Sequence, residues 1–377
     1  MTVIAGYARS PFTPARKGGL ARTRPDDIAA MVVDGLIEKL GLDPTLVEDI
    51  IVGTAFPEGE QGFNLARMLT FLTDLPESVP GVTINRFCGS SMQAIHDAAG
   101  RIAMGAGEAF IAGGIESMTR IPMTGFNPMP NPRMSDIAPD AFTSMGITAE
   151  NLAVKYEIDR VTQEAFAIES HARASSAREA GNLADEIVGI ETDDGLVSED
   201  GCIRPGTDAE TLAGLNPAFD ASGSVTAGTS SPLTDGAAFV LVCTEEFAQE
   251  NGLKPLARIL STAVSGCAPE LMGIGPVEAS NKALERAGLT LDDIDIVELN
   301  EAFAAQSLAV IQELGLDSSK VNIDGGAIAL GHPLGASGAR ITGKAASLLQ
   351  RNGAKLALAT MCVGGGQGIA TVLEKYE

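Results

Sequence analysis

The first and last thirds of this 377-residue chain carry the same order of short β-rich runs and helical segments. This internal repeat is the feature that most constrains the fold, because each copy must form a similar unit. The first copy is expected to form strands at residues 3–7, 49–52, 82–85 and 109–112. Apolar residues recur at helical spacing between residues 28 and 36, so a helix should separate the first two strands.

The second copy repeats this order, with strands expected at residues 257–261, 295–297, 321–324 and 356–360. A helix should begin at Pro276 and end at Gly288, since proline favours helix starts and glycine favours helix ends. The alternation of strands and helices predicts an α/β fold of two units, each a mixed sheet covered by helices, which pack as pseudo-twins.

The repeat also suggests a division into domains. The N-terminal half should comprise residues 1–117 with 226–250, and the C-terminal half residues 251–377. Residues 118–225 are rich in Met, Pro, Gly and Asp, and are expected to form an inserted loop domain with one clear helix near residues 163–180. Its Pro-rich tract at 121–140 is too long for an ordinary connection, which indicates a functional or assembly role.

Charge and hydropathy argue against several partners. The net charge is −23, so nucleic acid would be repelled and is not an expected partner. No apolar run approaches the roughly 18 residues of a membrane helix, and no membrane insertion is expected. The first residues resemble a strand rather than a secretory signal, so we expect a cytoplasmic protein.

The cysteines and histidines are too scattered to predict a disulfide framework or a metal site. Free thiols and no metal are therefore expected. Three cysteines and two histidines are expected only to pack in the core or face solvent: Cys202, Cys243, Cys267, His96 and His171.

Reactive residues occupy similar places in the two copies. Cys88 lies between a predicted strand and a predicted helix, and His332 lies at nearly the same place in the second copy. Both should be near helix N-termini, where free N–H groups and the helix dipole favour negative charge. For Cys88 this predicts a lowered thiol pKa and a better nucleophile.

Two further positions complete the candidate site. Cys362 follows the last core strand and precedes Gly364, Gly365 and Gly366, a turn whose N–H groups could bind an oxyanion. Asn300 follows the strand at 295–297, and the ends of strands in α/β sheets converge on ligand sites.

Four motifs, in this order and spacing, resemble those of the thiolase family, which includes acetyl-CoA acetyltransferases and 3-ketoacyl-CoA thiolases. They are Cys-Gly-Ser at 88–90, Asn-Glu-Ala-Phe at 300–303, Gly-His-Pro-Leu-Gly at 331–335 and Cys-Val-Gly-Gly-Gly at 362–366. The resemblance covers the whole chain and implies an acyltransferase.

The resemblance implies duplicated α/β units with mixed five-stranded sheets in a layered α-β-α-β-α arrangement, plus an inserted loop domain for CoA binding and oligomerisation. It implies a homodimer or homotetramer, and it leaves open a β-oxidation dehydrogenase partner. Coenzyme A and acyl-CoA thioesters would be substrates, and no tightly bound cofactor is expected.

The resemblance also implies a ping-pong reaction. Cys88 would attack the substrate and become acylated while His332 takes up its proton, and Cys362 would exchange a proton with acetyl-CoA. One oxyanion hole would use His332 and a water held by Asn300; the other would use the N–H groups of Cys88 and Gly364.

Several positions match residues that bind CoA in the family. Ser231 resembles a serine that touches the pantetheine arm, and Arg204 resembles a basic residue beside the adenosine. Ala227, in the segment before Ser231, is assigned to the same site. Four further residues match the pantetheine tunnel and acyl pocket: Phe219, Met145, Met272 and Phe303.

Two departures from biosynthetic members favour a degradative 3-ketoacyl-CoA thiolase: Thr229 replaces an asparagine and Ser144 replaces a histidine. Biosynthesis of acetoacetyl-CoA from two acetyl-CoA molecules is the alternative. A decarboxylating condensing enzyme would carry a histidine where this chain has Asn300. A non-catalytic acyl-CoA-binding protein would have no use for Cys88, His332 and Cys362 together.

Overall fold

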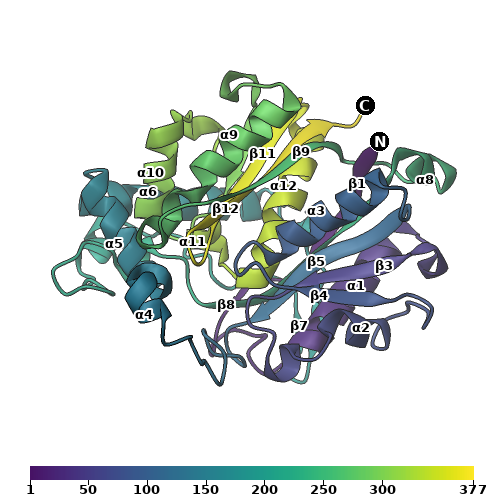
Figure 1. Ribbon diagram of the computed structural model, residues 1–377, viewed down its shortest axis with the longest axis horizontal. Coiled ribbons are helices and arrows are strands. Elements are labelled where there is room, and N and C mark those ends of the chain that lie inside the picture. Colours follow the sequence, from purple (N-terminus) through teal and green to yellow (C-terminus); the bar gives the residue numbers. More distant parts are fainter.

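The computed structural model describes residues 1–377, and ten of its strands form one continuous mixed sheet (Figure 1). The N-terminal copy contributes β4-β3-β5-β8-β1, with β2 beside β8, and the C-terminal copy contributes β10-β11-β12-β9. The strands are β1 (Thr2–Arg9), β2 (Thr13–Pro14), β3 (Asp49–Gly53), β4 (Gly81–Ile84), β5 (Ala109–Ser117), β8 (Thr234–Thr244), β9 (Ala257–Gly266), β10 (Ile296–Leu299), β11 (Leu356–Val363) and β12 (Gln367–Lys375).

The two copies have matching topologies. β3 pairs with β5 in parallel as β10 pairs with β11; β8 and β1 then follow β5 in antiparallel order, as β12 and β9 follow β11. β4 pairs in parallel with the other edge of β3. The copies meet where β1 pairs with β9 through two residue pairs, Val3 with Arg258 and Ile4 with Ala257. The duplicated α/β architecture predicted from the repeat is confirmed.

Helices complete five layers. α1 (Pro25–Leu40) and α2 (Leu65–Thr70) cover the outer face of the N-terminal sheet, and α9 (Gly275–Ala287) and α10 (Ala304–Leu314) cover the outer face of the C-terminal sheet. α3 (Ser90–Ala103) and α12 (Ser337–Asn352) lie between the sheets. The predicted α-β-α-β-α arrangement is confirmed.

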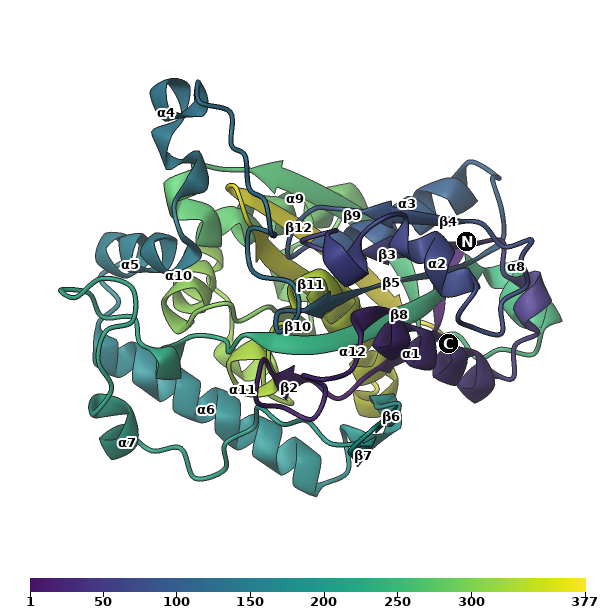
Figure 2. The ribbon, with the colours of Figure 1, turned by 90° about the horizontal axis from the view of Figure 1, so that it is seen from below.

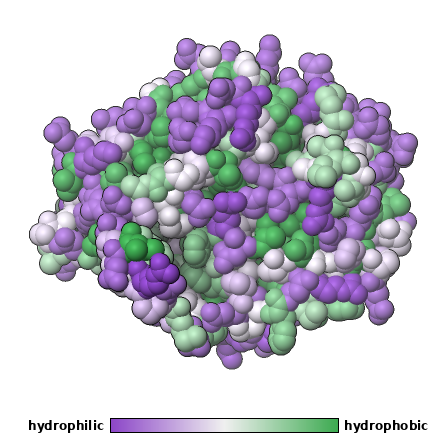
Figure 3. All heavy atoms as spheres, in the orientation of Figure 1, coloured by the Kyte–Doolittle hydropathy of each residue, from purple (hydrophilic) through white to green (hydrophobic).

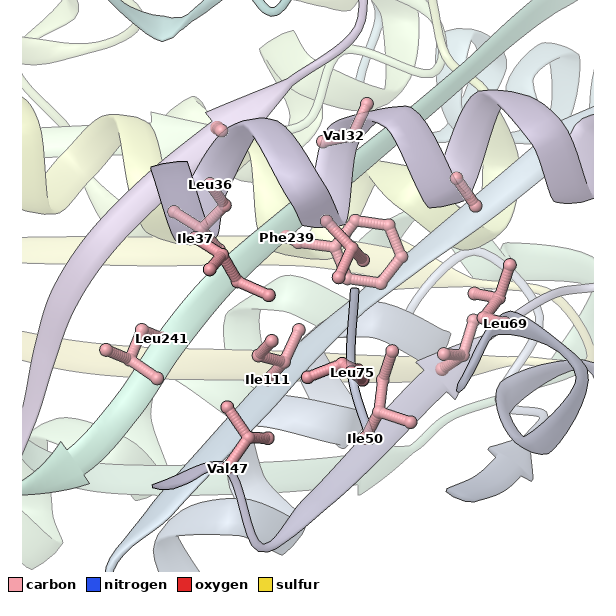
Figure 4. Packing of buried hydrophobic residues seen from close by; sticks show 14 of the residues in the cluster. Val32, Leu36, Ile37, Val47, Ile50, Leu69, Leu75, Ile111, Phe239 and Leu241 are labelled. Atoms are coloured by element: carbon pink, nitrogen blue, oxygen red, sulfur yellow. The ribbon is translucent and has the colours of Figure 1, made fainter. Parts of the chain in front are cut away.

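The outer N-terminal core shows why α1 forms where it does. Pro25 occupies the first turn of the helix, and Gly41 ends the helix in the left-handed conformation. Apolar residues at helical spacing then point from α1 onto the sheet. Figure 4 shows side chains of α1 above those of β8, β5 and β3: Val32, Leu36, Ile37, Phe239, Leu241, Ile111 and Ile50.

The middle layer is closely packed because glycines of α12 allow neighbouring elements to approach. A Cβ atom at Gly338 would lie 2.4 Å from the backbone nitrogen of Met92 in α3, and one at Gly343 would lie 2.3 Å from the ring of Tyr7 in β1. Most of α12 is buried, including Arg340 and Lys344. This helix therefore contacts both sheets at once.

The segment between the halves carries most of the remaining helices, which lie to one side of the sheets in Figure 2. The predicted helix near 163–180 is confirmed as α6 (Arg160–Glu179), whereas α5 (Met145–Lys155) was not expected from the sequence. The proposed boundaries of this loop domain stay a prediction. The same segment also contains α4 (Met134–Ile137), β6 (Ile190–Thr192), β7 (Gly195–Val197) and α7 (Ala209–Ala213). Two further short helices lie outside it: α8 (Glu245–Glu250) and α11 (Ala327–Leu330).

The strand predicted at residues 321–324 is wrong, and the C-terminal sheet keeps only a bridge between Val321 and Val297 at that edge. Asn322 has a left-handed φ of 48°, so the backbone turns away. Its side-chain amide takes over the pairing: the Leu299 N–H donates to Oδ1 at 2.9 Å, and Nδ2 donates to the Leu299 carbonyl at 2.8 Å. A side chain thus replaces the fifth strand.

The helices can be compared with the expectation that the chain does not insert into a membrane. None of them is both long and apolar enough to cross a bilayer. On the face shown in Figure 3, hydrophilic side chains are mixed with scattered hydrophobic ones.

Candidate active site

Cys88 lies between β4 and the N-terminus of α3, as predicted, and its side chain is 9% exposed. The predicted lowering of its pKa is wrong: burial raises the pKa of the thiol to about 11. The Gly364 N–H faces the sulfur and lowers this pKa, while the negative charge of Glu116 raises it further. Loss of hydration outweighs the helix N-terminus, so Cys88 rests as a neutral thiol.

His332 lies in the loop before α12 and is 4% exposed. Burial, with a contribution from Arg340, lowers its pKa to about 3, so the imidazole is neutral near pH 7. Its Nδ1 is 2.5 Å from the Ser337 Oγ, which itself donates to the Pro333 carbonyl at 3.1 Å. Because the serine proton is directed to that carbonyl, Nδ1 carries the imidazole proton and Nε2 presents a lone pair.

Asn300 follows β10 and has no exposed surface. Its Nδ2 lies 3.4 Å from the His332 Nε2, consistent with an amide donor facing the imidazole lone pair. Its Oδ1 is buried and has no partner in the protein, which leaves an acceptor free for a water or a substrate group.

Glu301 fixes the position of Asn300. Its carboxylate accepts hydrogen bonds from the Ser170 hydroxyl at 2.6 Å, the Asn322 amide at 2.8 Å and the Ile328 N–H at 3.2 Å. The acidic residue of the Asn-Glu-Ala-Phe motif thus ties the end of β10 to the loop domain and to the loop before α11.

Cys362 lies near the end of β11 and is 1% exposed. Burial and the neighbouring Cys88 raise the pKa of its thiol well above the ordinary value, so it too rests protonated. A three-residue turn joins β11 to β12, and Gly365 and Gly366 adopt left-handed φ values of 76° within it. This turn brings the Gly364 N–H to Cys88.

The two sets of residues come together through the helices that follow them. The first turn of α12 donates from the Ala339 N–H to the Ser91 Oγ of α3 at 2.8 Å. The first turns of the helices that follow Cys88 and His332 therefore meet in the middle layer.

Four predicted acyl-pocket residues gather beside Cys362. Met272 and Phe303 share a buried cluster with this cysteine, and Met145 packs against it. Phe219, which is half-exposed, forms an edge-to-face pair with Phe303 with ring centroids 5.7 Å apart. These side chains make an apolar wall next to the second thiol.

The other predicted CoA-binding residues are more dispersed. The Ser231 Oγ donates to the Ala302 carbonyl at 3.1 Å, which places it beside the same cluster. Ala227 is exposed at the start of a short 3₁₀ helix, and Arg204 is exposed in the loop domain, where its N–H donates to the His171 Nδ1 at 3.2 Å. No hydrogen bond or ion pair joins the Arg204 side chain to Cys88 or Cys362.

Several residues of the site were not found from the sequence. Ser337 and Thr234 hold His332, the latter by accepting from its backbone N–H at 3.0 Å. Glu116 and Gln367 contact the loops that carry the candidate residues. Glu116 carried a usable signal, because it is a lone carboxylate at the end of an apolar strand.

The remaining cysteines and histidines behave as expected. Cys202 and Cys243 are buried, and His96 and His171 pack against the Thr371 hydroxyl and the Arg204 backbone. No group of three or more His, Cys, Asp or Glu side chains is arranged to hold a metal ion.

Comparison with known proteins decides the family. The model "Thiolase, N-terminal domain" matches residues 2–246, and "Thiolase, C-terminal domain" matches residues 253–375. The chain belongs to the thiolase family. It is therefore an acyltransferase enzyme.

Individual relatives of this thiolase cover nearly all of its length. The 3-ketoacyl-CoA thiolase of Idiomarina loihiensis is 50% identical and covers 99% of both chains, and that of Bacillus subtilis is 46% identical and covers 99% of this chain and 98% of the relative. The crystal structure of the Bacillus anthracis acetyl-CoA acetyltransferase matches with a TM-score of 0.92 at 40% identity, covering 100% of this chain and 98% of that one.

Proposed function

We propose that this thiolase is an acetyl-CoA C-acyltransferase (3-ketoacyl-CoA thiolase) that cleaves 3-ketoacyl-CoA with coenzyme A. The products would be acetyl-CoA and an acyl-CoA shortened by two carbons. The observation that supports the proposal is a pair of neighbouring neutral thiols, Cys88 and Cys362, and a neutral imidazole, His332, beside Asn300, where the helices that follow Cys88 and His332 pack against each other. The names of the full-length relatives support the same activity.

The first half-reaction would break the C2–C3 bond of the substrate. The Nε2 lone pair of His332 takes the proton of Cys88, and the sulfur attacks the C3 carbonyl. The C2–C3 bond then breaks, the acyl group stays on Cys88, and the acetyl-CoA enolate receives the proton of Cys362. Acetyl-CoA leaves.

The second half-reaction would transfer the acyl group. The Cys362 thiolate takes the proton of coenzyme A, whose sulfur attacks the acyl carbon on Cys88. The shortened acyl-CoA leaves, and the proton on His332 returns to Cys88. Both thiols and the imidazole regain their initial protonation states, so protons balance over the cycle.

Two sets of donors would stabilise the oxyanions. The N–H groups of Cys88 and Gly364 serve the acyl group, while protonated Nε2 of His332 and a water bound to Asn300 serve the other thioester. The unpartnered Oδ1 of Asn300 and the position of Gly364 beside the Cys88 sulfur support this assignment.

The substrate would lie along the apolar wall beside Cys362. Phe219, Met145, Met272 and Phe303 contact the acyl and pantetheine groups in this proposal, and Ser231 and Ala227 contact the pantetheine arm. Arg204 would lie by the adenosine phosphates, because a cation suits that part of an acidic protein. Coenzyme A is a substrate here, and the proposal includes no tightly bound cofactor.

A substrate-length series in the thiolysis direction tests the activity. Cleavage of 3-ketoacyl-CoA from C4 to longer chains supports the proposal. Activity confined to C4 would instead favour acetoacetyl-CoA synthesis, the alternative that the acetyl-CoA acetyltransferase structure raises.

The role of Cys88 has a direct test. Incubation with 3-ketoacyl-CoA should leave an acyl adduct on Cys88, visible by peptide mass spectrometry. Cys88→Ala should lower turnover by at least about 10³-fold while CoA still binds, because a nucleophile cannot be replaced by binding energy alone. Full turnover by this variant would refute the role.

The edge of the N-terminal sheet supports a homo-oligomer. β4 is the last strand there, and exposed apolar side chains flank it. Phe63 is 95% exposed, and Phe71, Leu72 and Phe87 are also exposed. We propose that a second copy of the chain covers this edge.

Phe63→Asp should weaken that self-association, because it places a charge in a buried contact. Analytical ultracentrifugation at several protein concentrations measures this. The exposed Met104→Asp, on the loop after α3, is the control and should leave association unchanged. A cytoplasmic location, a dehydrogenase partner and a choice between dimer and tetramer remain predictions.

A further inference from the structure

Glu116 is a buried carboxylate that the proposed reaction does not use. It lies near the end of β5 and is 1% exposed. Its Oε2 accepts from the Ala55 N–H at 2.7 Å and the Gly335 N–H at 2.9 Å. Its Oε1 accepts from the Gln61 amide at 2.7 Å and the Thr54 hydroxyl at 3.2 Å. All four donors are neutral.

One of these bonds leads to His332. Gly335 is three residues beyond it, in the same loop before α12. The loop lies directly on the N-terminal sheet, because a Cβ at Gly335 would be 2.6 Å from the Thr54 Cα and 2.8 Å from the Glu116 Oε2. Glu116 therefore holds a loop of the C-terminal half on a strand of the N-terminal half.

The other backbone bond leads to Cys88. Ala55 donates to Glu116, and its carbonyl accepts from the Asn85 Nδ2 at 2.9 Å. The Asn85 Oδ1 then accepts from the Phe87 N–H at 2.7 Å, next to the nucleophile. Glu116 is thus the point at which the supports of the two loops meet.

The charge of Glu116 also acts on Cys88. The Gly364 N–H from the β11–β12 turn and the Glu116 carboxylate of β5 both act on this thiol, which also lies close enough to the neutral Cys362 thiol of β11 to affect it. Glu116 is the charged member of this set, and it disfavours a second negative charge on Cys88.

We propose that Glu116 is a positioning residue that fixes the separation of Cys88 and His332, and that its negative charge adds to the effect of burial in disfavouring a free Cys88 thiolate. The inference rests on the proposed roles of these two residues. It assigns to one carboxylate both the alignment of the nucleophile with its base and the suppression of a free thiolate between turnovers.

Glu116→Gln tests both parts, since the amide has one acceptor oxygen in place of two and carries no charge. We expect kcat for thiolysis to fall about 10- to 100-fold with KM changed less than threefold. The rate of Cys88 alkylation by iodoacetamide at pH 8, followed by peptide mass spectrometry, should rise three- to tenfold. A residue that only supported the fold would not make the nucleophile more reactive while turnover fell.

Asn85→Ala breaks the same chain of contacts at an exposed side chain and leaves the charge in place. It should lower kcat without increasing alkylation, and it keeps the inference testable if Glu116→Gln does not fold. Asp235→Asn is the matched control, because Asp235 is buried on the adjacent β8 and accepts from Ser117 and Thr119, not from the His332 loop. Its kcat and alkylation rate should stay within threefold of the parent enzyme.

The outcomes separate the inference from the proposed function. If the parent enzyme forms no acyl adduct on Cys88, the function itself fails. If the adduct forms, the inference alone is overturned by unchanged kcat or unchanged alkylation in Glu116→Gln, or by full kcat in Asn85→Ala.

Discussion

At the scale of single residues, the proposed chemistry depends on three groups that are all neutral at rest. Burial raises the pKa of both thiols and lowers that of His332, so no thiolate–imidazolium pair exists before substrate binds. In the proposed reaction, His332 therefore has to remove a proton from a neutral thiol. This differs from cysteine enzymes that hold a preformed thiolate.

The alkylation of Cys88 should reflect this neutral state. Its rate should rise about tenfold per pH unit from pH 7 toward pH 10, because the reactive thiolate forms with a pKa of about 11. Iodoacetamide labelling at Cys88, read by peptide mass spectrometry, measures the profile. A plateau below pH 8 would contradict it.

The residue scale also shows why the pKa of Cys88 was wrongly predicted from the sequence. A helix N-terminus lowers the pKa of a nearby thiol, and this local argument can be made from the sequence. Burial acts in the opposite direction and is stronger, and the cluster that buries Cys88 includes residues of α12 and β11, more than 200 positions away in the sequence. The position of Cys88 between a strand and a helix could be predicted from the sequence, whereas its protonation state required the packing.

At the scale of elements, the geometry of the β11–β12 turn depends on contacts from outside the turn. Gly365 and Gly366 have no side chains that could fix it. Gln367 does so instead: its Nε2 donates to the Gly364 carbonyl at 3.0 Å, and its Oε1 accepts from the Arg86 Nη1 at 2.9 Å. The oxyanion turn of one half is thereby tied to the Cys88 loop of the other.

Gln367→Ala should lower kcat about tenfold with little change in KM, because it frees the Gly364 turn without touching substrate. Steady-state kinetics with a C4 and a longer substrate measure this. Gln367→Glu separates the two contacts: it keeps the acceptor for Arg86 and removes the donor to Gly364, so it should be impaired as well. Normal kcat in both variants would show that the turn keeps its conformation without the Gln367 side chain.

The helices and strands also show how much of the secondary structure could be predicted from sequence patterns. Helical spacing and β-rich runs predicted α1, α9 and most strands of both copies, but not β8 or β12. They failed at residues 321–324, where the Asn322 side chain competes with strand pairing. They also missed α5, whose apolar residues pack in a buried cluster with residues from distant segments, such as Met272 and Phe303.

At the scale of the whole molecule, buried ion pairs fasten the loop domain to both halves. Arg9 of β1 contacts Glu186 and Asp200, and Lys344 of α12 contacts Glu186 and Asp324. Each carboxylate has a cationic partner, which offsets the cost of removing it from water. No sequence pattern predicted this network of ion pairs, because the paired residues lie far apart in the chain.

Acid should destabilise the fold through its buried histidines. The pKa of His332 is about 3 in the folded chain and about 6.5 when unfolded, so below pH 6.5 the unfolded chain binds a proton that the folded chain does not. Stability is lost as pH falls through this window. Between pH 6.5 and 4.5, the free energy of unfolding should drop about 2 kcal/mol less in His332→Gln than in the parent.

Chemical denaturation at the two pH values measures this difference. His96→Gln, whose parent histidine also has a pKa lowered to about 3, should behave in the same direction. Parallel pH profiles for parent and variant would mean that His332 is protonated in the folded chain.

The shared middle layer has a consequence for synthesis on the ribosome. The inner face of the N-terminal sheet, with Phe110 and Val240, is covered in part by α12, which begins only at Ser337. A nascent chain therefore exposes much of that apolar surface until α12 has been synthesised. Premature stop codons before this helix should yield aggregates or chaperone-bound chains, and not a folded half-enzyme.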